Sequence, residues 1–135
     1  MGLDNGIILK ANESEDWMNI YCPYYDSKDD FHHEGYCIAY WRKCWGIRDA
    51  ILHKLDPKHI QKDGGHYKIE YEDIGALIRA LKPFLSRDYW EEKAESIWDY
   101  DEYFDNTYHI LIRLEWLKDY MKEHPDVECY FYDSF

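Results

Sequence analysis

The sequence predicts a single α+β domain, in which a small, mostly antiparallel sheet carries about three helices on one face. A chain of 135 residues has the usual length of one domain, and its 46% hydrophobic residues are enough for a core. Three short segments have the residue types of strands, and longer segments between them show helical periodicity. Because no repeat or low-complexity linker divides the chain, residues 1–135 are expected to form one domain.

The first half predicts a strand, a long loop and a helix. Residues 6–10 (GIILK) form a short β-prone run. Residues 11–35 are polar and rich in turn-forming residues, but their aromatic side chains favour an ordered loop packed on the domain. Residues 38–55 predict the first helix, because their Trp, Ile and Leu residues share one side at 100° per residue. Arg48 falls inside that apolar side.

The second half predicts two further strands and two further helices. The turn signal KDGG at 62–65 precedes a strand at 66–71. Residues 72–82 carry apolar side chains at helical spacing and begin with two acids, which the helix dipole favours. A third helix is expected at 103–123, and VECYFY at 127–132 predicts the last strand.

The charge of the chain disfavours some classes of partner. The formal net charge is −12, whereas proteins that bind DNA or RNA directly usually have a basic surface. Residues 1–65 hold 8 basic and 11 acidic residues, and residues 66–135 hold 8 and 17, so the excess lies mainly in the second half. An acidic surface of this kind steers a protein toward basic partners.

The sequence predicts a cytoplasmic protein. No run of about 18 apolar residues is present, so no membrane span is expected. The start, MGLDNG, has neither the pattern of a signal peptide nor that of a myristoylation site. In the cytosol the four cysteines, Cys22, Cys37, Cys44 and Cys129, are expected to stay reduced.

Several short motifs occur in order along the chain: MGLD at the start, YWRK at 40–43, DGGHYKIEYEDIGALI at 63–78, YDEYF at 100–104 and CYFYDSF at the end. Together they resemble a widespread family of small bacteriophage and prophage proteins of unknown function, over residues 1–10 and 36–135. The family pattern often has His where this chain has Arg48, and Asn where it has Trp45. The resemblance implies a phage-type accessory protein in the cytoplasm of a bacterial host, and it implies no activity.

Arg48 is the first candidate site residue, because a guanidinium on a face that will be buried needs a carboxylate partner. The sequence suggests Asp4, on the segment that precedes the first strand, as that partner. The alternative interpretation is an anion site in which Arg48 acts as a bidentate clamp.

A second candidate site combines basic and aromatic residues near the same helix. Tyr40, Arg42 and Lys43, together with Arg48, could hold a phosphate and stack a base, which would make the protein a small-molecule or nucleotide-binding domain. The ordinary interpretation of Arg42 and Lys43 is a solvated helical face.

Metal and catalytic motifs give weaker signals. Cys22, His32, His33, Cys37 and Cys44 could supply zinc ligands, but their spacing lacks the paired CxxC or HxxxH pattern, so no metal is expected. No motif of a nucleophilic hydrolase, P-loop protein, dinucleotide-binding protein or zinc protease is present, and no cofactor is indicated. A metal-dependent enzyme using Asp99, Asp101 and Asp105 remains a further alternative.

The acidic and aromatic segment at 88–105 is the most distinctive part of the sequence. Eight acids stand there against one lysine, interleaved with aromatic residues. Carboxylates beside exposed aromatics are typical of a face that binds protein, although a solvated helical face has a similar composition. The predicted partner-binding residues are Glu91, Glu92, Glu95, Trp98, Asp99, Tyr100, Asp101, Glu102, Tyr103 and Asp105.

The favoured interpretation is therefore a non-enzymatic protein that binds a basic protein surface. In the phage context that the resemblance implies, the expected target is host machinery that handles nucleic acid, including a defence enzyme such as a CRISPR nuclease. Neither the oligomeric state nor the order of the strands follows from the sequence.

Overall fold

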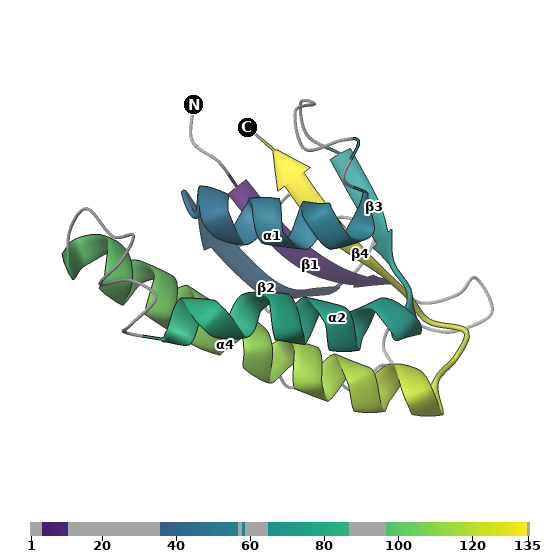
Figure 1. The fold of residues 1–135 in the computed structure, drawn as a ribbon. Helices are drawn as coiled ribbons and strands as arrows, with labels where there is room; N and C mark the ends of the chain where they lie inside the picture. Colours follow the sequence, from purple (N-terminus) through teal and green to yellow (C-terminus); the bar gives the residue numbers. More distant parts are fainter. Residues whose placement is uncertain (1–3, 11–35, 57, 59–64, 87–96, 135) are drawn as a thin grey trace.

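The computed structural model describes residues 4–10, 36–56, 58, 65–86 and 97–134, with the backbone alone described at Tyr36 and at 97–103. These residues form a four-stranded antiparallel sheet with the α-helices gathered on one side of it (Figure 1). The predicted α+β class, with a small antiparallel sheet and helices on one face, is confirmed.

The described elements follow one another in the order β-β-α-β-α-α-β, with a short 3₁₀ helix between the last two α-helices. Their bounds are β1 Asp4–Lys10, β2 Tyr36–Arg42, α1 Trp45–Leu55, β3 Gly65–Ile69, α2 Tyr71–Leu81, η3 Lys82–Leu85, α4 Ile97–Glu123 and β4 Glu128–Ser134.

The order of the strands across the sheet is β2-β1-β4-β3. The two ends of the chain therefore supply the two central strands, β1 and β4, which pair along their whole length from Asp4↔Ser134 to Lys10↔Glu128. One irregularity between Ile7 and Ile8 leaves Ile38 of β2 without a direct partner, as in a β-bulge. The sheet is therefore complete only when β1 and β4 have paired.

The predicted helix at 38–55 is wrong in its first half. Residues 36–42 form the edge strand β2, and the helix begins only at Trp45. Between them Lys43 has a positive φ of 60°, which turns the chain from strand to helix. The spacing of the apolar residues in YCIAYWR fits a helix as well as a strand. Its aromatic and β-branched side chains favour a strand, and hydrogen bonding to β1 makes the segment a strand in the folded protein.

The other elements lie close to their predicted positions. Helix α2 begins at Tyr71 because Glu70 and Asp73 form a reciprocal capping box, in which the Glu70 amide donates to Asp73 Oδ2 at 3.0 Å. Helix α4 begins at Ile97, six residues before the predicted start. Strand β4 extends to Ser134. The predicted loop at 11–35 lies outside the described residues.

The core lies between the sheet and the helices. On the sheet it contains Ile7 and Leu9 of β1, Trp41 of β2 and Phe131 of β4, with the rings of Trp41 and Phe131 stacked at 6.0 Å. Alternate residues of β4 are buried, as expected for a strand with one face on a core. Within the described ranges, no helix is long and apolar enough to cross a membrane.

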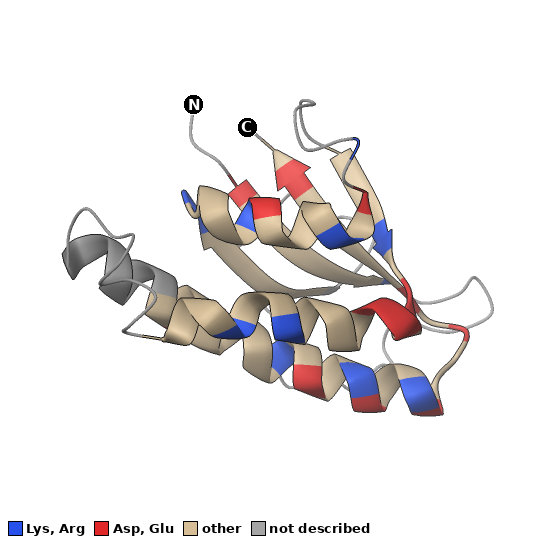
Figure 2. Cartoon of the chain, in the orientation of Figure 1, with Lys and Arg blue, Asp and Glu red and all other residues tan. Residues whose placement is uncertain are grey.

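Charge is balanced over the part of the chain whose side chains are described. Lysines and arginines are interspersed with acids along α1, α2 and α4 (Figure 2). The acidic excess comes instead from two other stretches. Residues 11–35 hold seven acids and one lysine, and residues 87–103 hold seven acids and two basic residues.

The described cysteines, Cys37, Cys44 and Cys129, are at most 1% exposed and are free thiols. Burial also raises the pKa of the Cys129 thiol, so almost no thiolate forms there in the folded protein. In a Cys22→Ser variant, we therefore expect all three remaining thiols to react with a disulfide reagent only when urea unfolds the chain. Fast reaction of any of them in the native protein would contradict the described burial of these thiols.

Candidate functional site

Arg48 is buried, with 2% of its surface exposed, and it lies on the same face of α1 as Ile47, Ile51 and Leu52. Its Nε donates to Asp133 Oδ1 on β4 at 2.8 Å, and neither side chain is more than 3% exposed. The expectation that this guanidinium is buried against a carboxylate is confirmed, and the carboxylate is that of Asp133.

Three further side chains, Asn5, Asp49 and Trp45, contact this ion pair. Asn5 on β1 donates to Asp133 Oδ1 at 2.9 Å, so this carboxylate oxygen of β4 accepts from one strand, β1, and from one helix, α1. Arg48 Nη1 donates to the half-exposed Asp49 at 3.0 Å. The Trp45 ring, with its centroid 5.4 Å from Arg48 Cζ, covers the guanidinium on another side.

One row of the sheet carries the polar groups beneath α1. Asn5 is the direct neighbour of Trp41 on one side and of Asp133 on the other. Trp41 Nε1, Asn5 Oδ1 and Asp133 Oδ2 are buried and have no hydrogen-bond partner within the described structure. Two of the Arg48 nitrogens already donate to carboxylates of the protein itself. The arrangement therefore favours a structural ion pair over a site in which Arg48 binds an external anion.

The predicted pair of Asp4 with Arg48 is wrong. Asp4 Oδ1 accepts instead from Arg42 Nε at 2.8 Å and from Tyr40 Oη at 2.7 Å. The reason is the alternation of β1, whose successive residues point to opposite faces of the sheet. Asn5 faces α1 and contacts Asp133. Asp4 therefore faces away from the helices, where it contacts Tyr40 and Arg42 at the C-terminal end of β2.

The same alternation divides the predicted nucleotide site. Tyr40 and Arg42 lie with Asp4 on the face of the sheet away from the helices, whereas Arg48 lies under α1. Lys43 is in the turn between β2 and α1. The four residues therefore do not line one site, and Arg42 already has a carboxylate partner.

The predicted acidic face falls mostly outside what is described. Glu91, Glu92 and Glu95 lie outside the described residues, and of Trp98, Asp99, Tyr100, Asp101, Glu102 and Tyr103 only the backbone, in the first turns of α4, is described. Asp105 is exposed on the same helix. Their role in binding stays a prediction.

The alternative of a metal-dependent enzyme stays a prediction, because Asp99 and Asp101 lie in the first turns of α4, where only the backbone is described. Among the described side chains, no group of three or more potential ligands could hold a metal ion. Of the cysteines considered for zinc, Cys44 lies in the core, while Cys37 belongs to β2 beside Ile8 and is not part of that core cluster.

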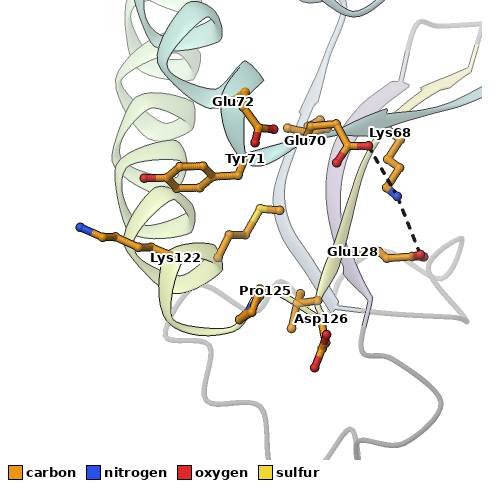
Figure 3. Close-up of a pocket in the computed structure, with 11 residues that line it drawn as sticks. Lys68, Glu70, Tyr71, Glu72, Lys122, Pro125, Asp126 and Glu128 are labelled. Carbon is orange, nitrogen blue, oxygen red and sulfur yellow. Dashed lines mark ion pairs between the residues drawn. The ribbon is translucent and has the colours of Figure 1, made fainter.

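A second candidate site, which the sequence did not predict, lies where α2 begins and α4 ends. We call it the acidic hollow; it is lined by residues 68–72, 121–122 and 125–128 and has a volume of about 530 Å³. Tyr71 and Lys122 stand on one side of it, and Lys68 and Glu128 stand on the other (Figure 3). Its lining includes four carboxylates and two lysines.

Lys68 is the charged group that joins two of those carboxylates. Its ammonium lies 3.5 Å from Glu70 and 4.0 Å from Glu128, and all three side chains are about half exposed. The pKa of the neighbouring Tyr130 is raised, first because its hydroxyl donates to Glu128 at 2.8 Å and then by desolvation and the charges of Glu128 and Glu70.

Sequence reasoning missed this hollow because its lining comes from two regions that are distant in sequence, 68–72 and 121–128. The sequence pattern indicated only the acids at the start of α2, and they were interpreted as groups that the helix dipole stabilises. Comparison of the chain with protein-family models, with curated proteins and with solved structures gave no match. The fold and the two sites thus define the protein as a small α+β domain with an acid-lined surface hollow.

The buried ion pair predicts unequal effects for two similar substitutions. Asp133→Asn leaves the Arg48 charge buried without its buried carboxylate partner, and should lower the free energy of unfolding by on the order of 3 kcal/mol. Asp4→Asn removes a partly exposed pair and should lower it by about 1 kcal/mol or less. Urea unfolding measures both.

A double variant tests whether the charge itself carries the effect. Arg48→Met combined with Asp133→Leu removes both charges, and should regain much of the stability that Asp133→Asn loses. Equal stability of the Asp133→Asn and Asp4→Asn variants would contradict the assigned pairing.

Proposed function

We propose that this protein is a non-enzymatic binding domain that attaches to a basic surface of another protein through its acidic and aromatic segment at 88–105. The resemblance to phage proteins suggests a phage accessory protein. The proposed target is host machinery that handles nucleic acid, and a defence nuclease is the leading example.

One observation carries the proposal: the acidic excess is separate from the charges of the described framework. The framework pairs its own charges, as in Arg48 with Asp133 and Arg42 with Asp4. Outside 11–35 and 87–103, acids and bases are almost equal in number. Like charges crowded at 88–105 repel one another, so a contribution to folding explains them poorly, whereas a basic partner explains both their sign and the aromatic residues among them.

The two alternative functions find less support. A nucleotide site would need Arg48 beside Tyr40 and Arg42, but the sheet separates them and Asp4 neutralises Arg42. A metal-dependent enzyme would need Asp99, Asp101 and Asp105 to share one ion, and among the described side chains no group of three or more potential ligands could hold a metal ion.

Charge reversal tests the proposal. We expect Asp99→Lys, Asp101→Lys and Glu102→Lys together to leave the fold intact, because they relieve the mutual repulsion of the crowded acids at 88–105. The same triple variant should lose a basic partner that the unchanged protein captures from host lysate at low salt. Capture itself should weaken as salt rises, since ions screen the attraction.

A matched control makes the same change of charge elsewhere. Glu13→Lys, Glu15→Lys and Asp16→Lys add as much positive charge within the other acidic stretch, and should weaken capture less. If the partner binds the Asp99, Asp101 and Glu102 variant with unchanged affinity and salt dependence, the acidic segment is only a solvated surface.

A further inference from the structure

A row of helix-facing positions runs across all four strands of the sheet beneath α1. Asn5 of β1 is the direct neighbour of Trp41 on β2 and of Asp133 on β4. Asp133 is in turn the direct neighbour of Gly65 on β3. Trp41, Asn5 and Asp133 are at most 2% exposed, so these three side chains are shielded from bulk solvent.

Three polar atoms of this row have no hydrogen-bond partner among the described residues. They are the donor Trp41 Nε1 and the acceptors Asn5 Oδ1 and Asp133 Oδ2. Leaving such a group unpaired in a protein interior carries a free-energy penalty, and buried polar groups are nearly always paired with the protein or with ordered water. Three unpaired atoms at adjacent positions therefore point to a ligand that has both donors and acceptors.

The unpaired atoms lie close together. Asn5 Nδ2 donates to Asp133 Oδ1 at 2.9 Å, so only this hydrogen bond and the widths of one amide and one carboxylate separate the two unpaired oxygens. A second donation, to the Tyr132 carbonyl at 3.2 Å, fixes the amide, because a flipped amide would place its oxygen against two acceptors. Trp41 stacks on Phe131 of β4, and β1 runs between their strands, so the indole crosses the strand that carries Asn5.

The combination of one donor with two acceptors selects the chemical class of the ligand. A metal cation would be repelled by the Trp41 N–H and by the Arg48 guanidinium that donates to Asp133. An anion would be repelled by the Asp133 carboxylate. Water can accept from the indole and donate to both oxygens, and a buried water molecule typically makes about three hydrogen bonds.

Tyr67 borders the row on the side of β3, where Gly65 has no side chain. A Cβ atom at Gly65 would lie 3.5 Å from the Tyr67 hydroxyl, so the phenol covers the position next to Asp133. Burial first, and then the negative charge of Asp133, raises the pKa of Tyr67, as expected for a hydroxyl near that carboxylate. Tyr67 is only partly buried, so it is the outer member of the row.

We infer that ordered water is bound beneath α1 as a structural ligand, which donates to Asn5 Oδ1 and Asp133 Oδ2 and accepts from Trp41 Nε1. This water links β2, β1 and β4 at the point where the ion pair of Arg48 with Asp133 attaches α1. Both oxygens of the buried carboxylate then accept hydrogen bonds. The inference is independent of the acidic segment at 88–105 and of the proposed function.

A high-resolution crystal structure of the full-length protein tests the site directly. We expect well-defined water density within about 2.7–3.2 Å of Trp41 Nε1, Asn5 Oδ1 and Asp133 Oδ2. Direct contact between Trp41 Nε1 and Asn5 Oδ1, or a row without water density, would overturn the inference.

Nuclear Overhauser spectra of the ¹⁵N-labelled protein test the same site in solution. Long-lived water should give the Trp41 indole proton a cross-peak at the water frequency whose sign differs between laboratory-frame and rotating-frame spectra, whereas proton exchange keeps one sign. The Trp45 indole, on a side chain that is 46% exposed, is the control within the chain and should lack this dipolar peak. Tyr67→Phe removes an exchanging hydroxyl next to the row and should leave the Trp41 peak unchanged.

Matched variants assign the water to the row. Asn5→Leu removes one acceptor and should abolish the Trp41 cross-peak, whereas Asn106→Leu, the same change at an amide that contacts Cys44, should keep it. A peak that persists in a folded Asn5→Leu variant would place the water elsewhere and contradict the assignment. If Asn5→Leu does not fold, the crystal structure and the spectra of the unchanged protein decide.

Discussion

The ion pair between Arg48 and Asp133 is the interaction on which the rest of the structure depends. It joins α1 to β4 across 85 positions of the sequence, and Asn5 adds β1 across a separation of 128. Taking two charges out of water carries a large desolvation penalty, which the attraction offsets only when the geometry is correct. A buried pair of this kind therefore adds little net stability and strongly disfavours arrangements in which α1, β1 and β4 are displaced.

This constraint explains why the two ends of the chain form the centre of the sheet. Strands β1 and β4 carry Asn5 and Asp133 in one row, so their register is fixed by polar groups as well as by hydrophobic alternation. A slip of one residue would move Asp133 to the face away from Arg48 and leave a guanidinium unpaired in the core. Because these contacts are so distant in sequence, we expect them to form late in folding.

Both arginines of the predicted nucleotide site, Arg42 and Arg48, have structural partners, and this organisation shapes the proposals about function. Arginines that could bind an anion, Arg42 and Arg48, are held by carboxylates on opposite faces of the sheet. What the proposed function leaves for a partner is the acidic segment at 88–105, a dense run of negative charges.

The sequence by itself determined the fold class, helix α2, most of α4 and the last strand, because their periodicity and capping signals are local. It also placed Arg48 on a buried face, since Ile47, Ile51 and Leu52 surround it on α1. Only the tertiary structure decided that residues 36–42 are a strand, because a short aromatic run suits a helix or a strand until β1 offers its hydrogen bonds. The partner of Arg48 and the acidic hollow depended on the same long-range packing. Asp133 is distant in sequence from Arg48, as residues 68–72 of the hollow are from 121–128, and no local pattern records which residues the strand order β2-β1-β4-β3 brings together.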